Sequence, residues 1–169
     1  EMCGRDWSSD VCSSDLVGAA IQTIIEIGDA TALEEAVSDA FDGASLQVGE
    51  HFQIEMQQYG LLRPLSAAEL SDGTLRYILL VAALLSPRPP ELMILNEPEG
   101  SLHPDLLEPL ARLLAKASKQ SQIIVVSHSR QLVAALDEEA SSRAIELHKD
   151  HGETFVADPC DISWKWPKR

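Results

Sequence analysis

The sequence has few cysteines and no long apolar run, and each absence excludes a class of protein. It contains 3 cysteines in 169 residues, at positions 3, 12 and 160, which is not the framework of a disulfide-rich secreted scaffold. No apolar run approaches the ~18 residues that span a bilayer, and no basic start followed by an apolar core marks a signal peptide. We therefore expect a cytoplasmic protein without a membrane segment.

Basic residues are also scarce. The chain has 13 Lys and Arg against 27 Asp and Glu, which gives a net charge of −14. Such an acidic chain lacks the basic surface that broad nucleic-acid binding requires. Its hydrophobic content of 45% is sufficient for one globular domain or for one lobe of a larger domain.

The first sixteen residues point to an origin outside the natural protein. The stretch Asp6–Leu16, DWSSDVCSSDL, reads as the translation of a common sequencing-library adapter. Glu1–Arg5 have no assignable origin. We therefore predict that residues 1–16 are a non-native, adapter-derived segment, and that residues 17–169 are the natural domain.

The first part of that domain combines helical and strand-like patterns. Residues 17–27 are apolar and rich in β-branched side chains, and residues 30–41 carry apolar side chains at helical spacing. Alternating apolar and polar residues predict a strand pair over 45–48 and 52–56.

From residue 75 onward, apolar helices and short strands alternate. The helices are expected over residues 75–85, 103–117 and 131–136. Short apolar runs predict fully buried strands over residues 92–95 and 123–126. A strand pair over residues 143–147 and 154–156 closes the series. This order predicts an α/β fold with a mainly parallel sheet flanked by helices.

The first motif, LSDGT, lies at the start of the helix predicted over 75–85. The hydroxyl of Ser71, the close approach that Gly73 permits, and free backbone N–H groups at a helix start all suit a phosphate. The candidate nucleotide-binding residues are Ser71, Asp72, Gly73 and Thr74. The alternative is an ordinary capped helix.

Polar residues around this motif indicate how the chain enters the helix. Ser66 and Glu69 form a capping-box pattern that predicts a short helical turn. Arg63 and Arg76 flank the motif, and they either face phosphate in a dimer or pair with the many carboxylates.

The second motif, LMILNEPE, is an apolar strand followed by Asn96 and Glu97. It resembles a Walker B element, in which the first polar residue steadies a magnesium ion through water and the following glutamate orients or deprotonates the attacking water. The alternative is a strand that ends in solvated polar residues. The sequence SLHP that follows favours the Walker B interpretation, because ABC-type ATPases have a dimer-contacting turn, the D-loop, at this place.

The third motif is an apolar strand followed by His128, 31 residues after Glu97. A lone histidine in this position is more often a surface or capping residue. One helix and one strand separate the two motifs, so a parallel sheet would bring His128 and Glu97 to the same edge.

Together, the three motifs resemble those of AAA-type ATPases of the ABC/SMC/RecF-like branch over residues 63–136. The resemblance implies a domain that binds ATP and Mg²⁺, with Glu97 as the residue that activates water and His128 as the switch histidine at the γ-phosphate. It also implies a homodimer through the signature and D-loop, with ATP between the P-loop of one subunit and LSDGT of the other. DNA or an accessory protein stays open as a partner of regions outside this chain.

Two departures from the family pattern affect the expected activity. Asn96 replaces the acidic residue of the Walker B motif, and no GxxxxGK(S/T) P-loop occurs in the 169 residues. We expect the P-loop upstream in the full-length protein, which would hydrolyse ATP, and we expect this fragment alone to be inactive. The alternative is a hydrolysis-deficient module that dimerises when nucleotide binds.

Overall fold

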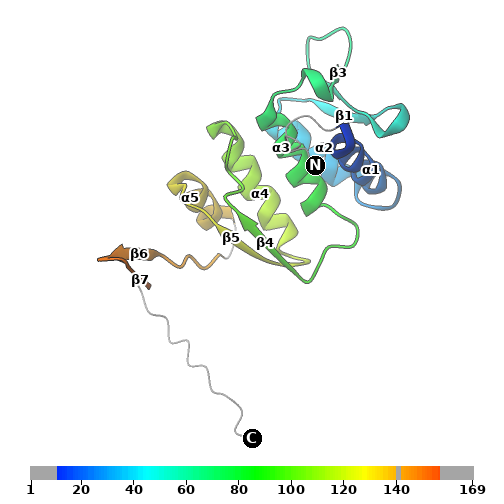
Figure 1. Ribbon diagram of the computed structural model, residues 1–169. Coiled ribbons are helices and arrows are strands. Elements are labelled where there is room, and N and C mark those ends of the chain that lie inside the picture. Colours follow the sequence, from blue (N-terminus) through cyan, green and yellow to red (C-terminus); the bar gives the residue numbers. More distant parts are fainter. Residues whose placement is uncertain (1–10, 140–141, 157–169) are drawn as a thin grey trace, which may run out of the picture.

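The structure is a computed structural model that describes residues 11–139 and 142–156. Cys3, Cys160 and most of the segment 1–16 lie outside these ranges. The described elements form an N-terminal group of helices around a small antiparallel sheet, and a second group around two parallel strands (Figure 1).

The N-terminal group contains two helices, α1 (Val11–Ile27) and α2 (Ala30–Ala40), and a three-stranded sheet. Strands β1 (Ser45–Val48), β2 (Ile54–Gln57) and β3 (Leu65–Ser66) pair antiparallel in that order. A 3-10 turn, η1 (Glu50–Phe52), joins β1 to β2. The helix expected over 30–41 and the strand pair that follows it are confirmed, except that the second strand begins at Ile54 because Phe52 lies in η1. The β-branched stretch 17–27 forms a helix.

The core of this group lies between α1, α2, β2 and the next helix, α3 (Asp72–Leu84). Its fully buried side chains include Ile21, Val37, Met56 and Tyr77. The Tyr77 ring meets Phe41 edge to face, with ring centroids 5.5 Å apart. The Tyr77 hydroxyl donates a hydrogen bond of 3.3 Å to the carbonyl oxygen of Ala36. Tyr77 therefore fixes α3 against α2.

The second group alternates strands and helices. After α3 come β4 (Leu92–Asn96), the 3-10 turn η3 (Pro104–Leu106), α4 (Leu107–Ala117), β5 (Gln122–Val126) and α5 (Arg130–Glu139). Strands β4 and β5 pair in parallel, with Asn96 opposite Val126. The leucines that recur at helical spacing along η3 and α4, Leu106, Leu110, Leu113 and Leu114, are all buried. The predicted α/β class and the crossover between parallel strands are confirmed.

The prediction that the two parallel strands are fully buried is wrong. Their side chains alternate between a half-buried face, which packs against the core, and an exposed face. The exposed face consists of Leu92, Ile94, Ile124 and Val126, which are 44 to 63% exposed. Helix α3 also leaves a large apolar side chain, that of Leu79, in solvent, at 51% exposure. Within the described residues, the parallel sheet is therefore covered on one face.

The closing strand pair differs from its prediction in position. Strand β6 (Leu147–Asp150) pairs antiparallel with β7 (Glu153–Val156), so the first strand begins where it was expected to end. Both turn residues, His151 and Gly152, have positive φ, as a two-residue type I′ hairpin turn requires. This turn fixes the pairing of Asp150 with Glu153, and neither strand joins β4 and β5.

Ion pairs join the two groups across α2 and α4. Arg112 of α4 donates two hydrogen bonds, of 2.8 and 2.9 Å, to the Asp39 carboxylate of α2. One turn further along α4, Lys116 binds Glu35 at 3.0 Å. The pairs are partly exposed, so they orient the helices more than they stabilise the fold.

Candidate ATPase site

The polar residues of the second and third motifs meet at the carboxyl ends of β4 and β5. The backbone N–H of Glu97 donates to the Val126 carbonyl at 2.8 Å, which extends the strand ladder by one step. Beyond this step the Nδ1 atom of His128 lies 3.5 Å from the Oε1 atom of Glu97. The expected meeting of both residues at one edge is confirmed as geometry.

The backbone of Glu97 is strained. Its φ is +46°, and a non-glycine residue held in such a conformation costs about 1 to 3 kcal/mol. The Glu97 N–H donates to the Val126 carbonyl. The Glu97 carbonyl accepts from Gly100 N–H at 3.0 Å and from Arg76 Nη2 at 3.1 Å. These hydrogen bonds hold the carboxylate at the strand tip, and such strain is commonly stored at functional sites.

Both side chains of this pair face solvent. The side chain of Glu97 is 57% exposed and that of His128 is 76% exposed. A ligand could reach both without any rearrangement of the described chain.

Glu99 is a third ionisable residue of the site, and sequence reasoning gave it no role. It is buried, at 9% exposure. Its Oε1 atom accepts a 2.5 Å hydrogen bond from Ser127 Oγ and a 3.3 Å bond from the His128 backbone N–H. The second acid of Glu-Pro-Glu was the available signal, but only the fold shows that the two glutamates face different surroundings.

The carboxylate of Glu99 is only half satisfied. Its Oε2 atom is buried and has no hydrogen-bond partner among the described residues, an arrangement that typically costs about 1 to 3 kcal/mol. Burial opposes the charge, but the hydrogen bonds from Ser127 and from nearby backbone N–H groups outweigh it and lower the pKa of Glu99. The group is therefore a carboxylate at neutral pH.

Hydrogen bonds fix the loop after β5. The Ser129 N–H donates to Ser127 Oγ at 3.0 Å, and Ser129 Oγ accepts from the Leu132 N–H at 3.2 Å. Ser129 thus caps α5, and Ser127 links that cap to Glu99. His128 lies between two serines whose positions are fixed.

The LSDGT motif begins α3 as predicted. Ser71 is the N-cap, and its Oγ accepts from Thr74 N–H at 3.1 Å. Ser71 and Asp72 are exposed, and the first backbone N–H groups of a helix have no partner within it. A Cβ atom at Gly73 would lie 2.7 Å from the carbonyl oxygen of Ser101, so the motif lies directly against the turn after β4.

The two arginines around this motif have different partners. Arg63 pairs with the carboxylate of Glu69 at 2.7 Å, which confirms one of the two alternatives. Arg76 instead donates to the backbone carbonyl of Glu97, which neither alternative included. Helix α3 is thereby joined to the strained peptide at the tip of β4.

The capping box before the motif is confirmed. Glu69 accepts from Arg63 and from both the backbone N–H and the hydroxyl of Ser66. The Arg63 hydrogen bond is the largest cause that lowers the pKa of Glu69 to about 2. This turn, η2 (Ala67–Glu69), delivers the chain to Ser71.

The strand tip fits a magnesium ion that arrives with a nucleotide. Among the described residues, no group of three or more His, Cys, Asp or Glu side chains could hold a metal ion. Mg²⁺ does not need such a group, because it keeps several waters and binds through one or two carboxylates plus phosphate oxygens. Asn96 offers an amide oxygen at the exposed tip, which can hold a water of such an ion by hydrogen bonding.

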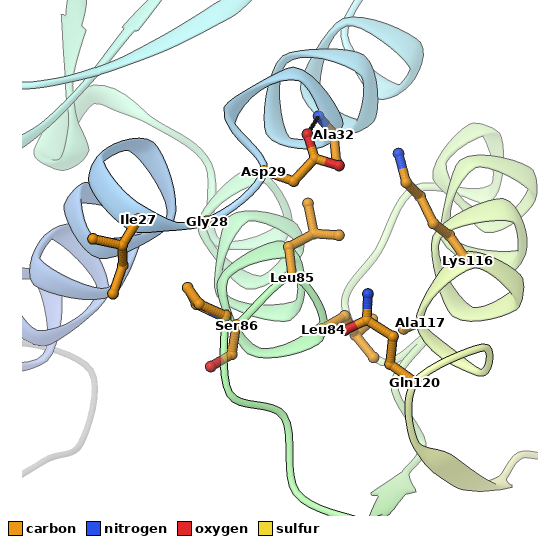
Figure 2. A pocket seen from close by; sticks show the side chains of 11 residues that line it. Ile27, Gly28, Asp29, Ala32, Leu84, Leu85, Ser86, Lys116, Ala117 and Gln120 are labelled. Atoms are coloured by element: carbon orange, nitrogen blue, oxygen red, sulfur yellow. Dashed lines mark hydrogen bonds between the residues drawn. The ribbon is translucent and has the colours of Figure 1, made fainter.

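A pocket at the other end of α3 is unrelated to this site. It lies where α1 ends and α2 begins, between Asp29, Leu85 and Lys116, and has a volume of about 220 Å³ (Figure 2). This is below the 300 to 1,000 Å³ typical of ligand pockets. Asp29 already caps α2 by accepting from Ala32 N–H, and Lys116 is paired with Glu35.

Residues 13–134 match the family described as "AAA domain, putative AbiEii toxin, Type IV TA system". The chain belongs to this AAA-domain family. Its members are ATPase domains, so this AAA domain carries an ATPase fold. No curated protein sequence matches it.

The fold of this AAA domain is similar to that of SMC ATPase heads in solved structures. A chain from work on "ATP-driven dimerization and DNA stimulated activation of SMC ATPases" matches with a TM-score of 0.60 at 17% identity, over 85% of this chain and 87% of that one. The SMC head domain from Thermotoga maritima has a TM-score of 0.57 and 20% identity, over 82% of this chain. The Smc head from Pyrococcus furiosus, bound to the C-terminal domain of ScpA, has a TM-score of 0.59 and 20% identity, over 75% of this chain.

The AAA domain covers only part of the longer heads. It spans 51% of the Thermotoga chain and 33% of the Pyrococcus chain. In the part that the structure describes, no helix is both long and apolar enough to cross a membrane.

Proposed function

We propose that this AAA domain is the C-terminal portion of an ABC-type, SMC/RecF-like ATPase head, in which Glu97 and His128 act in ATP hydrolysis. One observation carries the proposal: His128 Nδ1 lies 3.5 Å from Glu97 Oε1 at the tips of two paired parallel strands. Ligands bind at the carboxyl ends of such strands. The fold of SMC heads supports the same reading.

The chemistry follows from what each group can do. The Glu97 carboxylate would orient the attacking water and accept its proton, and a positioned base of this kind contributes about 10²- to 10⁴-fold in rate. His128 would donate a hydrogen bond to the γ-phosphate while its ring stays beside Glu97. Bound Mg²⁺ would neutralise phosphate charge during transfer. Asn96 would hold a water of that ion through its amide oxygen.

The signature motif suits a nucleotide bound by a second subunit. Ser71 caps a 13-residue helix that Asp72, Gly73 and Thr74 begin. Ser71 Oγ accepts from the Thr74 N–H, and the other N–H groups of the first turn would attract phosphate. We infer a homodimer in which ATP lies between the P-loop of one subunit and this motif of the other. The D-loop, which lies against Gly73, would line the same contact.

The exposed face of β4 and β5 indicates that another part of the head packs against it. Parallel sheets are normally covered on both faces, yet Leu92, Ile94, Ile124 and Val126 are open. We infer that the part of the polypeptide carrying the P-loop covers this face, and that residues 17–169 alone do not hydrolyse ATP. The origin of residues 1–16 in adapter sequence, the cytoplasmic location, and DNA or accessory-protein partners stay predictions.

Asn96 favours a second candidate function. An amide at this position contributes no negative charge toward the metal, so the head would bind ATP and dimerise without turnover. In that case the protein is a nucleotide-dependent interaction module.

Steady-state ATPase activity of the full-length protein with Mg²⁺ separates the two functions. For the hydrolase we expect turnover that Glu97→Gln reduces at least about 10²-fold and that His128→Ala also reduces. A parent without turnover that gains activity in Asn96→Asp would establish the interaction module instead. Turnover that survives Glu97→Gln would overturn the role of Glu97.

A further inference from the structure

We propose that Glu99 is a positioning residue, which sets where His128 lies relative to Glu97. The proposal rests on the ATPase function proposed above and adds a residue to it. Glu99 is buried and bonded to the loop that carries His128, so it would act through that loop.

A single oxygen atom of Glu99 joins the two strand tips. Glu99 belongs to the turn after β4, whereas Ser127 and His128 follow β5. Its Oε1 accepts from Ser127 Oγ at 2.5 Å and from the His128 N–H at 3.3 Å, and it lies 3.8 Å from His128 Nδ1. The backbone N–H and the imidazole ring of His128 therefore both lie beside the same carboxylate oxygen of Glu99.

Backbone pairing cannot do this alone. The β4 and β5 ladder ends at Asn96 and Val126 and is extended only by the Glu97 N–H bond to Val126, among the described residues. The two residues after Val126 lie beyond it. The hydrogen bonds from Ser127 and from the His128 N–H to the Glu99 carboxylate connect these two residues to the turn after β4.

The unpaired Oε2 atom of Glu99 favours a functional role for this carboxylate over a role in stabilising the fold. A buried carboxylate stabilises a fold when both of its oxygens are paired, whereas an unpaired oxygen opposes folding. Glu99 has one oxygen committed to the loop and the other without a partner among the described residues. Such a group is better explained by where it holds the loop than by the stability it adds.

The proposal predicts a split between binding and turnover. Misplacing a reacting group by about 1 Å can cost about 10²-fold in rate. Removing the Glu99 charge should therefore lower kcat by about 10- to 10²-fold, while KM for ATP stays within about twofold. Ser127→Ala should produce the same split, because it removes the shorter of the two hydrogen bonds.

The test uses the full-length protein and four variants: Glu99→Gln, Ser127→Ala, His128→Ala and the double variant Glu99→Gln/His128→Ala. Glu138→Gln is the matched control, because it removes the same charge from an exposed position on α5. If Glu99 acts through His128, adding Glu99→Gln to His128→Ala causes no further loss of kcat. Independent, multiplying losses, or a Glu99→Gln protein with parental kcat, would overturn the proposal.

A second readout does not need turnover. Hydrogen exchange of the peptide containing residues 127–129 should be faster in Glu99→Ala than in the parent and unchanged in Glu138→Ala, at equal thermal stability. Unchanged exchange in Glu99→Ala would contradict the contact. Full ATPase activity in both Glu97→Gln and His128→Ala would instead show that the catalytic roles proposed for these two residues are wrong, and the exchange result would still report on Glu99.

Discussion

Gly73 packs so closely against Ser101 that a Cβ atom at position 73 would lie 2.7 Å from the Ser101 carbonyl oxygen. The obstacle is backbone, so no side chain can rotate to relieve it. Ser101 itself has a φ of +63°, which limits how far its peptide can shift. The first turn of α3 and the turn after β4 therefore fit together only if residue 73 lacks a side chain.

Gly73→Ala should consequently destabilise the protein, although alanine is ordinarily favoured over glycine in a helix by about 1 kcal/mol. We expect a loss of about 1 to 3 kcal/mol from overpacking, measured by urea unfolding. Ala83→Gly, on the exposed side of the same helix, calibrates the ordinary preference and should cost about 1 kcal/mol. A stabilised Gly73→Ala protein would contradict the contact with Ser101.

Tyr77 offers a separate test of the core. Tyr77→Phe keeps the ring against Phe41 and loses the hydrogen bond to Ala36, so we expect a cost of about 0.5 to 1.5 kcal/mol. Tyr77→Ala empties a fully buried site, with an expected cost of about 3 to 5 kcal/mol. The same change at an exposed tyrosine, Tyr59→Phe (95% exposed), should be neutral in chemical denaturation. Equal effects at both positions would contradict the burial of Tyr77.

Glu69 predicts an acid-range titration. Arg63 and Ser66 lower its pKa from 4.5 to about 2, so the folded chain keeps this carboxylate charged after the unfolded chain has begun to protonate. Its contribution to stability is complete above pH 4.5 and is lost as the pH falls through about 2. An NMR titration of the Glu69 side chain should show a midpoint near 2, which Arg63→Gln moves upward. A parental midpoint near 4.5 would rule out the paired geometry.

The open strand face predicts how the isolated chain behaves. Residues 17–169 should bind an apolar fluorescent dye through Ile94 and Ile124, which are 63% and 44% exposed. Replacing both with threonine should reduce dye binding and leave the circular dichroism spectrum unchanged. Ile54→Thr, at a buried position, should instead disrupt the fold. Dye binding that is insensitive to positions 94 and 124 would place the exposed apolar surface elsewhere.

Local patterns predicted much of the fold. Helix α4 was predictable because its leucines recur at helical spacing, and α3 because Ser71 and the Ser66–Glu69 capping box mark a helix start. The short apolar runs of β4 and β5 were recognisable as strands, but composition could not show that one of their faces is open. Whether a face is open depends on which other segment packs against it, and the residue types at 92–95 do not indicate that segment.

The candidate site was predictable in part, for a related reason. Motif spacing placed Glu97 and His128 at one edge, because a single crossover joins their strands. The contact of Arg76 with the Glu97 carbonyl and the burial of Glu99 depend on tertiary packing. No periodicity distinguishes an exposed from a buried glutamate two residues apart.

The left-handed backbone of Glu97 has a consequence for how this chain can change. At a positive φ glycine fits with least strain, followed by asparagine and aspartate. Of these only aspartate has a carboxylate, and its side chain is one methylene shorter than that of glutamate. A screen that rewards only folding would therefore tend to discard the glutamate, whereas a screen that rewards turnover would retain it. The substitutions that position 97 tolerates therefore show whether folding or turnover determines the residue there.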